Sequence, residues 1–132
     1  MAWVFWEKSL ELLYSDDKVK EQCTSVKAAK KLFGGDATLA TKLLARINSL
    51  EQADTIKDII NMPPFHFHKL SNKDRKNLEG YFAIDVKSRK EPWRIILEPL
   101  DENKNPFVPC NIDEIAATVR IVGIVEVSKH YE

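Results

Sequence analysis

The side chains best suited to chemistry in this chain are its three histidines and the basic or aromatic residues near them. His66 and His68 lie two apart in the sequence FHFHKL, so both would point to one face of an extended strand. A basic run from Lys69 to Lys76 follows them at once. One expected strand begins near Trp93-Arg94, and the last expected strand is followed by His130-Tyr131. If the strand ends meet in space, these groups form one cluster.

Such a cluster is suited to handling phosphate. Histidine and tyrosine can move protons, aromatic rings can stack on bases, and arginine and lysine stabilise phosphate charge. RNA can be cleaved without a metal when a base deprotonates the 2′-hydroxyl and an acid protonates the leaving 5′-oxygen. Two alternatives remain open: an unused, exposed histidine pair with a solvated basic turn, and a metal site. A metal would need further ligands, such as His130, and no ligand spacing is present.

The composition is that of an ordinary globular chain. Its 132 residues are enough for one core, and the formal net charge of zero gives no general support for nucleic-acid binding. Residues 66–94, however, hold eight Lys or Arg against four Asp or Glu, so the centre is locally basic. Cys23 and Cys110 are expected to be reduced thiols. The apolar start, MAWVFW, is too short for a signal peptide or membrane span, so we expect a cytoplasmic protein without membrane contact.

The hydrophobic pattern changes from helical to alternating along the chain. We expect a short strand at 10–14, helices at 15–23, 25–33, 37–53 and 54–60, and strands at 65–70, 81–86, 92–100 and 117–127. Asp36 is the expected N-cap of the longest helix, and Pro63-Pro64 ends the last one. Residues 101–114 read as a polar connection, and the last strand as a central one covered on both faces. The predicted class is α+β, with N-terminal helices packed on a mostly antiparallel sheet of four to five strands.

Several segments in this order resemble a known family. They are LELLYSDDKVKEQC, ATKLLARINSLEQADTIKDI, HFHKL, GYFAIDV, PWRIIL and VEVSKHYE. The set is similar to the HigB-like killer toxins (plasmid maintenance system killer family) of the RelE/ParE superfamily. The similarity runs from about Leu10 to the end, which makes 1–132 a single toxin domain with residues 1–9 as an N-terminal extension.

The resemblance implies a function. Toxins of this type belong to type II toxin–antitoxin systems and act as metal-independent endoribonucleases, without a cofactor, that cut mRNA in the ribosomal A site and leave a cyclic phosphate. Their partners would be mRNA, the ribosome and a cognate HigA-like helix-turn-helix antitoxin. That antitoxin would silence the toxin, and promoter DNA would be reached only through it.

The resemblance also implies residue roles. His68 matches the active-site histidine and Arg94 the arginine that grips the scissile phosphate, while His66 would be a neighbour on the same strand face. The family often ends in Asp-Tyr-His, whereas this chain ends Lys129-His130-Tyr131-Glu132, so the general acid or base is either His68 or His130. The remaining assignments are Tyr131 for stacking or proton transfer, Arg75 as a second phosphate stabiliser, and an RNA-binding basic turn of Lys69, Lys73 and Lys76.

Two other functions stay open. A ParE-like toxin would keep the fold and inhibit DNA gyrase by binding, without needing His68, Arg94 and His130. A catalytically degenerate relative would act only as an interaction protein. The altered order of the C-terminal residues leaves this alternative open.

Overall fold

The computed structural model describes residues 9–72 and 77–129, and the following elements lie within these ranges. In chain order they are β1 (Glu11–Tyr14), α1 (Asp17–Thr24), α2 (Val26–Leu32), α3 (Ala37–Gln52), α4 (Ile56–Ile60), the 3-10 turn η2 (Pro63–Phe65), β2 (His68–Lys69), β3 (Phe82–Asp85), β4 (Arg94–Leu100), α5 (Ile112–Ile115) and β5 (Ile121–Ser128). No helix in the described ranges is long and apolar enough to cross a membrane.

The N-terminal helices begin at the side chains that the sequence indicates. The Asp16 carboxylate accepts a hydrogen bond from Val19 N at 2.8 Å, and the Asp36 carboxylate accepts one from Leu39 N at 3.1 Å. Each bond satisfies a backbone donor that has no partner inside its own helix. Between α2 and α3, Gly34 and Gly35 adopt φ values of 64° and 93°, which a residue with a Cβ rarely takes.

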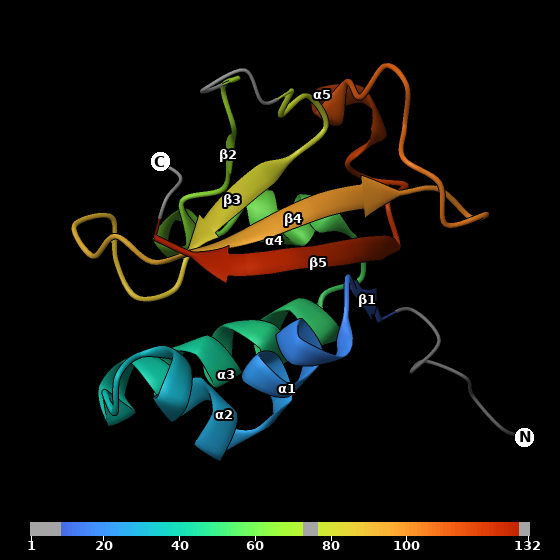
Figure 1. The fold of residues 1–132 in the computed structure, drawn as a ribbon. Helices are drawn as coiled ribbons and strands as arrows, with labels where there is room; N and C mark the ends of the chain where they lie inside the picture. The colour runs from blue at the N-terminus through green and yellow to red at the C-terminus, as the bar shows by residue number, and fades with distance from the viewer. Residues whose placement is uncertain (1–8, 73–76, 130–132) are drawn as a thin grey trace, which may run out of the picture.

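The sheet is mixed and has the order β1-β5-β4-β3-β2. Strand β1 pairs with β5 in parallel, and all other neighbouring pairs are antiparallel. Figure 1 shows the arrows of β3 and β5 pointing to the same edge of the molecule, where the β3–β4 loop projects. The α+β class with N-terminal helices on a mostly antiparallel sheet is therefore confirmed.

The helices and one face of the sheet share the main hydrophobic core. Leu43 and Leu50 of α3 pack in it with Ile84, Ile95 and Ile124 of the three central strands, and all five are completely buried. The other face carries a smaller apolar cluster, made of Leu70, Leu78, Ala83 and Ile96. Strand β5 has neighbours on both sides, as expected of a central strand, but its burial alternates, so its two faces are not covered equally.

Two other expectations are corrected by the backbone. The segment after Pro63-Pro64 first forms the turn η2, and His66 then takes a left-handed conformation with φ 51°. Strand β2 consequently begins only at His68, so the two histidines are not neighbours on one strand face. The connection at 101–114 contains the short helix α5, whose Ile112 and Ile115 pack against the main core.

Candidate functional site

The polar side chains of the sheet gather on the face turned away from the main core. Cross-strand pairing puts Asp85, Arg94 and Ser128 in one row. The next row, two residues along each strand, joins His68 to Ala83, Ile96 and Glu126. Residues paired across antiparallel strands, and residues two apart on a strand, lie on the same face. We call this side of the sheet the polar face, although Asp85, Arg94 and Ser128 are buried.

His68 is held in a defined orientation at the start of β2. Its Nδ1 lies 2.8 Å from the backbone oxygen of His66. Because a carbonyl oxygen can only accept, Nδ1 carries the proton and Nε2 is the nitrogen that can take one up. The rings of His66 and His68 also stack, with centroids 4.5 Å apart and planes 28° from parallel. The bond to the His66 oxygen and the stacking of the two rings therefore fix the orientation of the His68 ring.

His66 connects this ring to a buried carboxylate. Its Nδ1 lies 3.1 Å from Asp85 Oδ1, and Asp85 is only 1% exposed. The left-handed backbone at His66 directs its side chain toward this carboxylate, in a conformation that non-glycine residues seldom adopt. The structure therefore adds His66 and Asp85 to the site, where the sequence placed only His68.

Arg94 occupies the interior of the site. It is 7% exposed, and its Nε lies 3.3 Å from Asp85 Oδ1 as an ion pair without the alignment of a hydrogen bond. Its terminal nitrogens donate to the backbone oxygens of four residues in the loop before β4: Arg89 at 2.9 Å, Trp93 at 3.0 Å, Ser88 at 3.5 Å, and Glu91. The direct phosphate contact implied by the resemblance stays a prediction for Arg94, and it would require these bonds to open.

Arg46 of α3 supports the same region from the main core side. Its guanidinium donates to the backbone oxygens of Asp85 at 3.0 Å and Pro64 at 3.1 Å, and lies 4.4 Å from the centroid of the Phe65 ring. Burial lowers the pKa of Arg46, and the nearby Asp85 carboxylate opposes that shift. Arg46 thus joins the turn before His66 to the end of β3.

The remaining predicted residues fall into two groups. Lys69 is exposed on β2 beside His68. Lys73, Arg75, Lys76, His130 and Tyr131 lie outside the described residues. The last described residue, Lys129, has its Nζ 5.8 Å from the centroid of the Trp93 ring, so the described end of the chain lies beside the β3–β4 loop.

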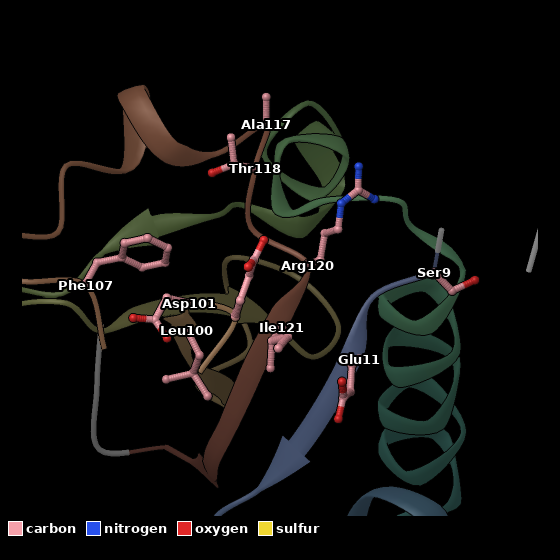
Figure 2. Close-up of a pocket in the computed structure, with 10 residues that line it drawn as sticks. Ser9, Glu11, Leu100, Asp101, Phe107, Ala117, Thr118, Arg120 and Ile121 are labelled. Carbon is pink, nitrogen blue, oxygen red and sulfur yellow. The ribbon is translucent and has the colours of Figure 1, made fainter. Parts of the chain in front are cut away.

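A cavity of about 630 Å³ lies at the opposite end of the sheet. Figure 2 shows Phe107 on one side of it, Glu11 on the other, and Leu100 and Ile121 between them. Its charged lining residues are Glu11, Asp101, Glu102 and Arg120. Three carboxylates against one guanidinium disfavour a phosphate ligand. The Asp101 carboxylate is in addition occupied by the backbone N–H groups of Asn103 and Asn105. This cavity is therefore a poor candidate for phosphate chemistry.

Within residues 9–72 and 77–129, no group of three or more His, Cys, Asp or Glu side chains could hold a metal ion. Further along the polar face, burial raises the pKa of Glu98, and a hydrogen bond with the Tyr81 side chain opposes that shift.

Comparison of the chain with known protein families, curated protein sequences and solved structures found no match.

Replacing His66 should reveal how much its contact with Asp85 stabilises the fold. We expect His66→Ala to lower the free energy of unfolding by about 1–3 kcal/mol, because a hydrogen bond to a charged, buried group is lost. His66→Asn should cost less, since asparagine tolerates a positive φ and its amide nitrogen can take the place of Nδ1. Urea unfolding of both variants measures the difference, and equal losses would contradict this role for His66.

Proposed function

We propose that the chain is the toxin of a type II toxin–antitoxin system and cleaves mRNA as a metal-independent endoribonuclease. The family resemblance supplies this function. The observation that best supports it is the tautomer of His68: its Nδ1 donates to a backbone oxygen, so Nε2 is the ring nitrogen that carries no proton. His68 lies on a polar sheet face whose nearby β3–β4 loop carries exposed cations.

In the proposed reaction, His68 Nε2 takes the proton of an RNA 2′-hydroxyl. The 2′-oxygen attacks the adjacent phosphorus, and the bond from phosphorus to the 5′-oxygen breaks. The leaving oxygen takes a proton from an acid, for which His130 and Tyr131 are the candidates from the resemblance. The products are a 2′,3′-cyclic phosphate and a 5′-hydroxyl, so the step needs no oxidant, reductant or added water.

The partners and location follow from the same proposal. The protein would act in the cytoplasm on mRNA in the ribosomal A site. A cognate HigA-like helix-turn-helix antitoxin would bind and silence it, and the pair would repress its own promoter.

Mapping of mRNA 5′ ends in bacterial cells after induced expression tests the function. New 5′-hydroxyl ends at a fixed position within codons are expected, and cells expressing His68→Ala should lack them. Intact mRNA accompanied by DNA breaks would replace the nuclease with a gyrase inhibitor. Intact mRNA and intact DNA would leave only an interaction protein, and would overturn the proposal as well.

A further inference from the structure

The β3–β4 loop, residues 86–93, exposes positive charge at the edge of the polar face. Lys87, Arg89 and Lys90 are all exposed. The one acidic residue of the loop, Glu91, is half-buried, and its carboxylate accepts a hydrogen bond from Trp93 N at 2.6 Å. The loop therefore presents three cations to solvent, while its single anion is engaged by its own backbone.

The backbone of this loop is fixed by two arginines that point into it. Arg94 donates to four of its carbonyl oxygens, and Arg46 reaches a fifth, that of Lys87, at 3.4 Å. Trp93 anchors the end of the loop by an edge-to-face contact with Phe33, with ring centroids 4.9 Å apart. A loop held in this way loses little further conformational freedom when it binds a ligand.

The surroundings keep the loop positive. The nearest buried acid, Asp85, is paired with Arg94 and contacted by His66. Lys129 adds a further cation next to Trp93. The chain as a whole carries no net charge, so this concentration of cations is a local property of the loop and not a consequence of overall composition.

We infer that the β3–β4 loop is a second RNA contact, in which Lys87, Arg89 and Lys90 bind backbone phosphates of the single strand next to the scissile one. The inference rests on the proposed function for the identity of its ligand. The two buried arginines act as positioning residues: they hold the loop, and the three exposed cations make the contact. Binding of this kind is independent of base sequence and sensitive to salt.

A pair of triple variants tests the loop. One variant replaces Lys87, Arg89 and Lys90 with alanine, and the matched control replaces Lys27, Lys30 and Lys31, which are exposed on α2. Both lose three positive charges. The ligand is a single-stranded 2′-O-methyl RNA, which lacks the attacking hydroxyl, and its affinity is measured across a series of salt concentrations.

Losing three phosphate contacts should reduce the slope of log K against log salt concentration by about 2 for a single strand. Raising the salt concentration from 50 to 200 mM lowers the affinity of both proteins. The fold decrease should be smaller by a factor of about 15–20 in the loop variant than in the wild type. The control should keep the wild-type slope. An unchanged slope in the loop variant, or an equal change in both variants, would overturn the inference.

The same proteins separate this inference from the proposed function. Wild-type cleavage of mRNA together with an unaltered slope in the loop variant would reject the loop contact and leave the nuclease. Salt-sensitive RNA binding through the loop without any cleavage would reject the nuclease and leave the loop contact. A wild-type protein that neither binds nor cleaves RNA would reject both.

Discussion

Replacing His68 with alanine is expected to lower the rate of RNA cleavage by about 10²–10⁴-fold, the usual contribution of a positioned acid or base. The reason is the loss of Nε2, because Nδ1 is already committed to the backbone oxygen of His66. The measurement is a single-turnover rate on mRNA in programmed ribosomes, with product ends identified as cyclic phosphate and 5′-hydroxyl.

His68→Asn is the matched variant for this prediction. Its amide nitrogen occupies nearly the position of Nδ1 and can still donate to the His66 oxygen, but nothing replaces Nε2. The asparagine variant loses the ring stacking with His66 but keeps this hydrogen bond, so it should be more stable than the alanine variant and still lose cleavage as alanine does. If the asparagine variant retained near wild-type cleavage, His68 would not be the base, and His130 would become the candidate base.

The regular elements of this fold can be read from the sequence because their signals are local. Asp36 begins α3 through a bond to a backbone N–H only three residues away, and the apolar stripe of that helix includes Leu43 and Ile47. The alternation around Ile84 likewise predicts strand β3, although both of its faces are buried. Where a short stretch of chain satisfies its own hydrogen bonds, the sequence is sufficient.

The site depends on contacts between segments far apart in the chain, and this is where prediction from sequence failed. Alternation treated His66 as part of a strand, although a hydrogen bond from its backbone N–H to Pro63 closes a turn there. Asp85 offered one signal, a charged residue in an otherwise apolar strand. Its partners, His66 and Arg94, become apparent only once the turn conformation and the strand register are known.

Arg94 shows that residue type and position in the sequence do not reveal burial: it is 7% exposed. An arginine at the start of a strand in a basic segment suits a ligand for phosphate, and the resemblance implies that role. In the structure it neutralises Asp85 and fills the centre of the β3–β4 loop. Its direct contact with phosphate stays a prediction, and Arg94 would also contribute to RNA binding indirectly, through the three cations that the loop presents.

Replacing Arg94 with alanine is accordingly expected to lower the free energy of unfolding by about 3–5 kcal/mol, because it leaves a buried carboxylate without its ion-pair partner. The four loop carbonyls lose their donors at the same time. Small domains typically have a free energy of unfolding of only about 5–15 kcal/mol, so this variant would be close to unfolding. Urea unfolding measures the loss, and Arg94→Lys keeps the test possible if the alanine variant does not fold.

A double-mutant cycle with Asp85→Asn isolates the buried pair. Asp85→Asn removes the negative charge, so Arg94→Lys should cost less in that background than in the wild type. Lysine keeps the charge but presents one nitrogen where the guanidinium bonds to four carbonyls, so Arg94→Lys should also reduce protection of the loop amides from hydrogen exchange. Additive losses in the cycle would show that Asp85 gains nothing from the guanidinium of Arg94 beyond its positive charge. Unchanged loop protection in Arg94→Lys would show that the guanidinium does not hold the loop, and the orientation of Lys87, Arg89 and Lys90 would need another cause.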